Sequence, residues 1–168
     1  MSIIVMGVSG AGKSTIAALL AKRLGCEFKD ADWFHPAENV RKMAAGIPLT
    51  DEDRWPWLHA IAAYLDTMRN SGRHAVVACS ALRRVYRDVL IGDRSDSVRL
   101  VYLKGSKHLI ASRMTGRQGH FMPAALLDSQ FAALEEPRAD ERPIVVSITE
   151  RPDRIVSEIV SELNLQRG

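Results

Sequence analysis

Short apolar runs alternate along this chain with segments in which apolar residues recur at helical spacing. The runs predict five strands, at 3–6, 26–30, 74–79, 98–103 and 144–148. The helical pattern begins with Ile16, Leu19, Leu20 and Leu24, and it predicts further helices at 36–45, 106–114, 123–134 and 153–165. The run at 74–79 is typical of a parallel strand buried on both faces. The alternation therefore predicts an α/β fold with a parallel sheet covered by helices on both faces.

Two consecutive helices are predicted between the second and third strands. The first covers 36–45, and Gly46 ends it. The second begins at a cap formed by Thr50 or Asp51 and runs to about Asn70. The sequence thus predicts a helical excursion from the sheet over 36–71.

Composition limits the class of protein. The chain has 168 residues, 46% of them hydrophobic and 26% charged, so we expect a single domain over 1–168. The net charge of +3 suits an anionic ligand, but the basic residues are scattered, and we expect no nucleic-acid partner. Cys26 and Cys79 lie far apart, which argues against a disulfide framework or a zinc site. No apolar run is long enough to span a membrane, so a soluble, cytoplasmic protein is expected.

The segment after the first strand carries phosphate-binding chemistry. It reads GVSGAGKS and fits the P-loop pattern G-x-x-x-x-G-K-[ST] between a strand and a helix. Its backbone N–H groups and the helix N-terminus would face the phosphates of a nucleotide, Lys13 would bridge the β- and γ-phosphates, and Ser14 would bind Mg²⁺. The predicted nucleotide residues here are Gly7, Ser9, Gly10, Ala11, Gly12, Lys13, Ser14 and Thr15. The alternative is a glycine-rich turn that binds nothing.

Two carboxylates follow the second strand. In extended backbone, Asp30 and Asp32 would project to the same side at the carboxyl end of this strand, where open α/β sheets bind ligands. One carboxylate could hold a water of the Mg²⁺ shell, and the other could accept a proton or hydrogen bond from a substrate hydroxyl. Alternatively, Asp32 caps a turn and Asp30 forms a surface ion pair.

The helix after the third strand begins with arginines. Arg83, Arg84 and Arg87 fall on or near one side of this helix, at spacings of three and four residues. They could face an anion, or they could form a solvated face, as charged helix surfaces ordinarily do.

A loop with two glycines and two potential cations is predicted over 115–123. This composition suits a lid that closes over phosphates and supplies charge to the transferring group. Arg113 and Arg117 lie one turn apart, so both could face the nucleotide. His120 is either a catalytic group or an ordinary loop histidine.

Four longer stretches resemble one group of P-loop kinases. They read GVSGAGKST, DADWFHPAENVRKMAAGIPLTDEDRWPWL, CSALRRVYRDVL and RQGHFMPAALLDSQFAALEEP, and extend over most of the chain from Gly7 to Pro137. In them the chain is similar to the gluconate kinases (gluconokinases), which belong with the shikimate and nucleoside monophosphate kinases. The resemblance implies phosphorylation of D-gluconate at its 6-hydroxyl by ATP with Mg²⁺, giving 6-phosphogluconate and ADP. It also implies a five-stranded parallel sheet, a substrate-binding excursion over 36–71, a lid over 115–123 and a homodimer.

With this resemblance, the expected catalytic residues are Asp32, Lys13 and Arg117. Asp32 would contact the attacking hydroxyl as a weak base, while Asp30 and Ser14 would serve the metal. Arg113 would lie against the adenine and Arg117 against the phosphates. Gln118 stands where relatives often carry a basic residue, so one lid charge is missing.

Gluconate brings a carboxylate and a row of hydroxyls, which call for a cation with polar neighbours. The candidates are Asp32, His35, Lys42, Arg54, Arg84 and His120. Arg54 and Arg84 rank first, because a guanidinium can bind a carboxylate through two parallel hydrogen bonds. Trp33, Trp55 and Trp57 could line the substrate pocket or pack the helical excursion.

Two other functions compete. A kinase of the same fold could act on shikimate, a nucleotide or another sugar acid, and a substrate panel would decide. A nucleotide-dependent switch protein is the alternative from another class, but no N-K-x-D stretch appears, and the lid and excursion would have no obvious use there.

Overall fold

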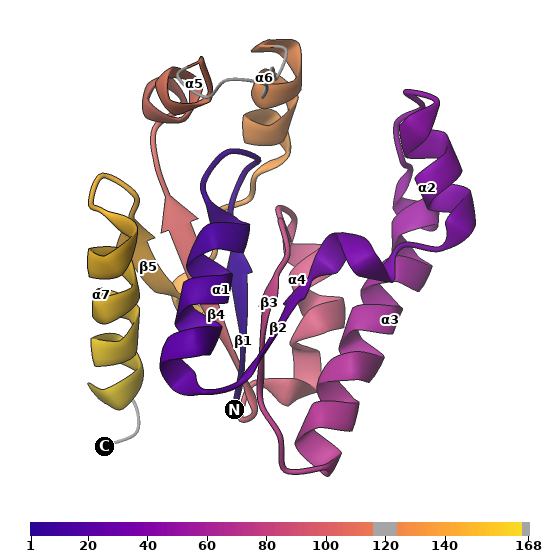
Figure 1. The fold of residues 1–168 in the computed structure, drawn as a ribbon. Helices are drawn as coiled ribbons and strands as arrows, with labels where there is room; N and C mark the ends of the chain where they lie inside the picture. The colour runs from indigo at the N-terminus through magenta and orange to yellow at the C-terminus, as the bar shows by residue number, and fades with distance from the viewer. Residues whose placement is uncertain (116–123, 166–168) are drawn as a thin grey trace.

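Five parallel strands form one sheet at the centre of the chain (Figure 1). The computed structural model describes residues 1–115 and 124–165. The strands are β1 (Ser2–Met6), β2 (Glu27–Asp30), β3 (Ala75–Ala78), β4 (Val98–Lys104) and β5 (Ile144–Ser147). Their order is β2-β3-β1-β4-β5, and every pairing is parallel. The predicted α/β fold with a five-stranded parallel sheet is confirmed.

The central strand, β1, carries apolar residues on both faces, and helices cover both of them. Ile3 and Val5 pack into the core on the side of α1 (Lys13–Leu24) and α7 (Pro152–Leu165). Ile4 and Met6 point to the other side and pack with residues of α3 (Asp51–Asn70) and α4 (Arg84–Leu90). Strand periodicity therefore gives two hydrophobic layers, one on each face of the sheet.

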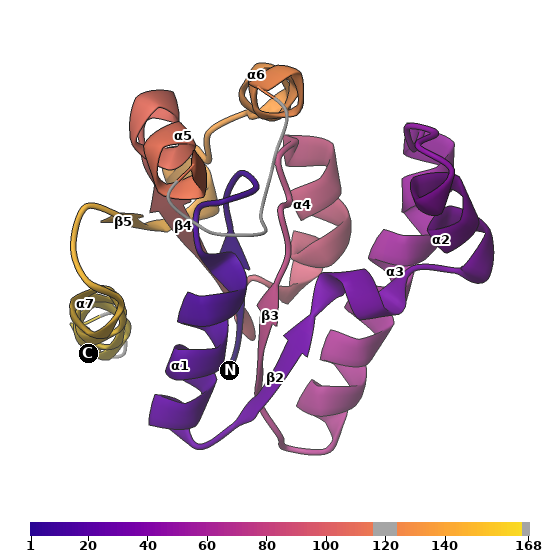
Figure 2. The same cartoon turned by 45° about the horizontal axis from the view of Figure 1, so that its top comes forward.

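Two helices lie beyond the carboxyl ends of the strands, beside the turn that follows β1 (Figures 1 and 2). They are α5 (Lys107–Thr115) and α6 (Ala124–Ala133). Short 3₁₀ helices η2 (Gly92–Arg94) and η3 (Ala139–Glu141) precede β4 and β5. Among the residues described, no helix combines the length and apolar character that crossing a membrane requires.

The predicted helical pair between β2 and β3 is present. It consists of α2 (Ala37–Ala44), which projects away from the sheet, and the longer α3 (Figure 2). Thr50, not Asp51, caps α3: its hydroxyl accepts from Asp53 N at 3.2 Å, and the Asp53 carboxylate accepts from Thr50 N at 2.9 Å. This reciprocal capping box satisfies two backbone donors and fixes where α3 begins.

Candidate active site

The turn between β1 and α1 has the shape that a phosphate-binding loop needs. Gly10 and Gly12 have φ values of 84° and 90°, in the left-handed region that glycine adopts without strain. A Cβ added to Gly10 would lie 2.7 Å from Met114 Sδ, so a side chain there would require Met114 to shift. Ser9 is held from α6, because Gln130 Oε1 accepts from Ser9 N at 3.2 Å. Gln130 went unrecognised in the sequence, although it lies within one of the stretches that resemble gluconokinases.

Lys13 begins α1 and points back over this turn. Its ammonium donates to the carbonyl of Val8 at 3.0 Å. Burial lowers the pKa of Lys13, while the charges of Asp32 and Asp30 act in the opposite direction. A half-buried ammonium at a helix N-terminus favours a polyanion as its partner, which would compensate the lost hydration.

Ser14 and the carboxylates after β2 meet on the other side of Lys13. The Ser14 hydroxyl donates to Asp30 Oδ2 at 2.8 Å, and Asp30 Oδ1 accepts from Asp32 N at 3.0 Å. The expectation that Asp32 continues an extended strand is wrong, because β2 ends at Asp30 and Asp32 lies in the 3₁₀ helix η1 (Ala31–Phe34). Asp30 caps this turn, and the turn returns Asp32 to the same cavity.

These groups line one cavity of about 290 Å³, the P-loop cavity. Its lining includes Lys13, Ser14, Asp30, Asp32, Trp57 and Ser80. Trp57 is held here by its indole N–H, which donates to the carbonyl of Ala31 at 2.7 Å. The sequence left open whether Trp57 packs the excursion or lines the pocket, and the structure shows that it does both.

The donor set fits a magnesium ion. Ser14 Oγ and Asp30 Oδ2 are hard oxygen donors 2.8 Å apart beside the phosphate-binding turn. Mg²⁺ is commonly bound by one or two protein oxygens together with waters and substrate phosphates. Within the described residues, no group of three or more His, Cys, Asp or Glu side chains is arranged to hold a metal ion.

A second cavity of about 350 Å³ lies on the opposite side of the P-loop. Gly10, Gly12 and Thr15 form one wall, and Arg113 from α5 also lines this cavity. The remaining wall comes from Thr149, Glu150, Arg151 and Pro152, between β5 and α7. Sequence reasoning missed this last segment, since its composition is that of an ordinary turn and only the fold brings it to the P-loop.

His35 lies between the P-loop cavity and the helical excursion. Its ring stacks on Trp57 with centroids 4.4 Å apart. Asn39, which is buried, donates through Nδ2 to the backbone carbonyl of Asp53 at 2.8 Å and contacts His35 Nδ1 at 3.2 Å. Because the amide nitrogen is a donor, His35 Nδ1 is the acceptor and the ring is neutral with its hydrogen on Nε2. Burial also lowers the pKa of His35, and Asp32 and Arg54 are near enough for their charges to affect it.

Two guanidinium groups converge on Tyr86. Arg54 and Arg83 each lie 5.6 Å from the ring centroid of Tyr86. Both contact Asp51, Arg83 at 2.8 Å and Arg54 at 3.4 Å, and the hydroxyl of Tyr86 donates to the same carboxylate. This hydrogen bond is the main cause that lowers the pKa of Asp51. Arg83 also lies 3.5 Å from Glu135 Oε1, so the two guanidinium groups of this cluster have two carboxylate partners.

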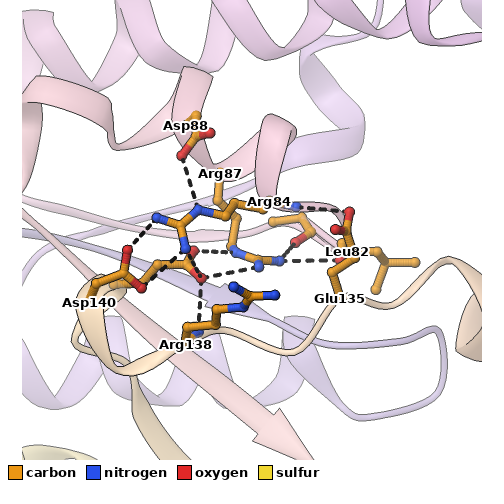
Figure 3. A network of polar contacts seen from close by, with 9 residues as sticks. Leu82, Arg84, Arg87, Asp88, Glu135, Arg138 and Asp140 are labelled. Atoms are coloured by element: carbon orange, nitrogen blue, oxygen red, sulfur yellow. Dashed lines mark hydrogen bonds and ion pairs between the residues drawn. The ribbon is translucent and has the colours of Figure 1, made fainter.

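Arg84 is not part of that cluster, contrary to its rank in the sequence analysis. Its guanidinium forms a pair with Asp140, at 3.1 Å for Nη1 (Figure 3). The cavity beside this pair is lined by residues of α4, β4 and η3, away from the P-loop. Arg84 follows Arg83 into the first turn of α4, and the helix directs it to the opposite side. Arg83 is the arginine that the sequence underrated.

Lys42 has a partner within the excursion. Its ammonium lies 2.8 Å from Asp53 Oδ1, which ties α2 to the capping box of α3. Lys42 and the Thr50 backbone together lower the pKa of Asp53 to about 2. Lys42 therefore has an ion-pair partner within the protein and does not need a substrate carboxylate to balance its charge.

The structure does not describe residues 116–123. The predictions for the lid over 115–123, and with it for Arg117, Gln118 and His120, lie outside the described residues.

Comparison with known proteins defines the family. The family model described as shikimate kinase matches residues 9–164. The gluconokinase of Gluconobacter oxydans (strain 621H) is 47% identical over 94% of this chain and 88% of its own length. The crystal structure of a gluconokinase from Sinorhizobium meliloti 1021 is 43% identical, covers 99% of this chain and 97% of its own, and superposes with a TM-score of 0.84.

A shikimate kinase from Aquifex aeolicus shares the fold, with a TM-score of 0.61 over 99% of this chain and 98% of its own, at 16% identity. This more distant likeness extends to architecture alone, whereas the gluconokinases match in sequence over almost the whole chain. The chain belongs to the gluconokinase family of P-loop kinases.

Proposed function

We propose that this protein transfers the γ-phosphoryl group of ATP to the 6-hydroxyl of D-gluconate, giving 6-phosphogluconate and ADP. The observation that carries the proposal is the single cavity that Lys13, Ser14, Asp30 and Asp32 share. It puts the groups suited to phosphates and the groups suited to a hydroxyl next to one another. The family membership argues for gluconate as the acceptor, since relatives that match over most of this chain are named gluconokinases.

The chain supplies positioning and charge, which is most of what phosphoryl transfer requires. The N–H groups of the P-loop would bind the phosphates, and Lys13 would exchange its contact with the Val8 carbonyl for β- and γ-phosphate oxygens. Ser14 and Asp30 would hold Mg²⁺, which neutralises charge on the phosphates when bound. Asp32 would accept the hydrogen bond, and then the proton, of the attacking hydroxyl. The adenosine moiety would occupy the second cavity, with Arg113 beside it.

Gluconate would extend from Asp32 toward the cluster of Arg54, Arg83 and Tyr86. The two guanidiniums are suited to the carboxylate because each presents several N–H donors in a plane. His35, neutral and protonated on Nε2, would donate to a hydroxyl between these ends. Trp57 would form an apolar wall beneath the substrate, as sugars and sugar acids often pack on aromatic rings.

The proposal is tested by measuring ADP release from MgATP with D-gluconate, shikimate, AMP, glucose and buffer in parallel. We expect strong stimulation by gluconate alone. The position of the phosphate in the product is then read by ¹³C and ³¹P NMR, where coupling of phosphorus to carbon 6 is expected. A phosphate on the 6-hydroxyl also couples to carbon 5 over three bonds, so coupling to any carbon beyond these two would refute the 6-hydroxyl as acceptor.

A second candidate is phosphorylation of shikimate, which the match to the shikimate kinase family model favours. Shikimate also carries a carboxylate and hydroxyls, so the arginine cluster alone does not discriminate between the two acids. The same panel does, because stimulation by shikimate alone would replace gluconate as the acceptor without altering the phosphate half of the site.

The homodimer, which the resemblance to the family implies, and the cytoplasmic location, which was expected from the sequence pattern, stay predictions. Sedimentation equilibrium of the purified chain tests the first, and a mass equal to one chain at all concentrations would refute it.

A further inference from the structure

The loop between β3 and α4 contains a strained backbone. Ala81 has a φ of 44°, and in the described part of the chain only one other non-glycine residue, Arg142, has a positive φ. The left-handed conformation is unfavourable for a residue with a Cβ, and it persists only where neighbouring contacts enforce it. Ala81 is also 1% exposed, so solvent does not stabilise its carbonyl.

Arg87 contacts this loop directly. Its side chain is 2% exposed and reaches back from α4, where Nη1 donates to the carbonyls of Ala81 at 2.9 Å and Leu82 at 3.2 Å. Glu141 from η3 accepts from Nε at 2.7 Å and from Nη2 at 3.3 Å (Figure 3). The backbone N–H of Glu135 adds a second donor to the carbonyl of Leu82, at 2.8 Å.

The strained loop carries groups of the active site on both sides. Before Ala81, Ser80 lines the P-loop cavity, and its carbonyl accepts from Gly7 N at 3.4 Å. After Leu82, Arg83 extends to Asp51 and Tyr86. The conformation at Ala81 therefore sets the direction from which Arg83 enters the proposed acceptor site.

Stability alone is a weak explanation for this pair. Apolar residues of similar volume often stabilise a fold as well as a buried ion pair does, because two charges must lose their water. A guanidinium differs from any apolar side chain in offering several N–H donors in fixed directions. Here those donors are used by two consecutive carbonyls and a carboxylate.

We propose that Arg87, oriented by Glu141, is a positioning residue that holds Ala81 in the left-handed conformation and thereby places Arg83 for the acceptor. This inference rests on the proposed function, in which Arg83 contacts the carboxylate of gluconate. Arg87 itself touches no substrate. Its loss should therefore weaken acceptor binding while leaving the nucleotide side of the site intact.

The test compares Arg87→Lys with Arg84→Lys. Lysine keeps the charge but replaces the planar fork with a single ammonium. In Arg87→Lys we expect the KM for gluconate to rise roughly tenfold or more, because a small displacement of a binding group has a large effect. The KM for ATP should change less than about twofold. Arg84 lies in the same helix, pairs with Asp140 and lies 3.9 Å from Glu141 Oε2, but it does not touch the loop carbonyls, so its variant should keep both constants.

Ala81→Gly provides the rescue. Glycine adopts positive φ without strain, so the loop no longer depends on Arg87 for its conformation. The double variant Arg87→Lys/Ala81→Gly should recover at least about a third of the gluconate affinity lost in Arg87→Lys. A folded Arg87→Lys protein with unchanged gluconate KM, or equal loss for both substrates without rescue, would overturn the proposal. If Arg87→Lys does not fold, Glu141→Gln takes its place, and the same changes in the gluconate and ATP KM values are expected.

A crystal structure of Arg87→Lys separates this inference from the proposed function. We expect residue 81 to leave the left-handed region and the Arg83 side chain to move away from Asp51. If these shifts occur but Arg83→Gln does not alter the gluconate KM, the proposed role of Arg83 fails, while the control of the loop by Arg87 stands. If residue 81 keeps its φ, the inference fails whatever the acceptor is.

Discussion

Ser14 Oγ donates a 2.8 Å hydrogen bond to Asp30 Oδ2, which joins the first turn of α1 to the end of β2. In the sheet, β3 lies between β1, the strand that leads to Ser14, and β2, the strand that ends at Asp30. The parallel sheet thus places a hydroxyl of the phosphate-binding turn against a carboxylate from the neighbouring crossover. Two hard oxygens in contact beside a phosphate site suit a hydrated divalent cation.

Removing the charge of Asp30 should weaken the use of Mg²⁺. In Asp30→Asn we expect the Mg²⁺ concentration for half-maximal activity to rise roughly 10- to 100-fold, as when an outer partner of a metal is lost. Kinase activity titrated with Mg²⁺ at fixed total ATP measures it. Glu27→Gln, at the opposite end of β2, is the control, because Glu27 pairs with Arg73 there. An unchanged Mg²⁺ dependence would exclude Asp30 from the metal site.

Asp32→Asn should lose most turnover and retain nucleotide binding. The amide cannot accept the proton of the attacking hydroxyl, and general-base contributions are roughly 100- to 10,000-fold. Steady-state kcat measures the first effect and isothermal titration with a non-hydrolysable ATP analogue the second. A kcat near the wild-type value would remove Asp32 from the chemical step.

Arg83 and Arg84 should differ sharply although they are adjacent. Arg83→Gln removes a charged donor from the cluster around Tyr86, so we expect the gluconate KM to rise about 10- to 100-fold, the equivalent of one lost charged hydrogen bond. Arg84→Gln breaks the pair with Asp140 and should leave the gluconate KM unchanged. The reverse order of effects would restore Arg84 as the carboxylate ligand and contradict the arrangement described above.

Asp53 should make the free energy of unfolding depend on pH in the acid range. Its pKa falls from 3.8 to about 2 in the folded chain, chiefly through the hydrogen bond from Lys42. A lowered folded-state pKa means that the unfolded chain binds the proton more readily, so this contribution is present above pH 3.8 and is lost as the pH falls toward 2.

The free energy of unfolding in urea, measured from about pH 2 to about pH 6, reports the contribution of Asp53, because a carboxylate titrates within this range. Asp53→Asn should lower the urea midpoint at pH 6 and flatten its dependence on pH. Glu52→Gln, in the same helical turn but outside the capping box, serves as the matched control. Equal slopes for Asp53→Asn and the wild type would show that the Lys42 pair does not stabilise the fold.

The sequence by itself determined the order of the elements, the parallel sheet and the position of the phosphate-binding turn. Each of these depends on local patterns, namely apolar runs, helical spacing and glycines at fixed offsets, which do not need distant contacts to be recognised. The two helices of the excursion were also predictable from the sequence, because the residues that end α2 and begin α3, Gly46 and Thr50, lie next to those helix ends.

Only the tertiary structure decided which cations serve the site. Arg83 and Arg84 are indistinguishable in the sequence, but one meets Asp51 from α3 and the other meets Asp140, 56 residues further along the chain. Asp32 likewise reaches the cavity through a 3₁₀ turn where an extended strand was expected. The directions of these side chains depend on helix phase and on charges that packing brings near, and a local pattern contains neither.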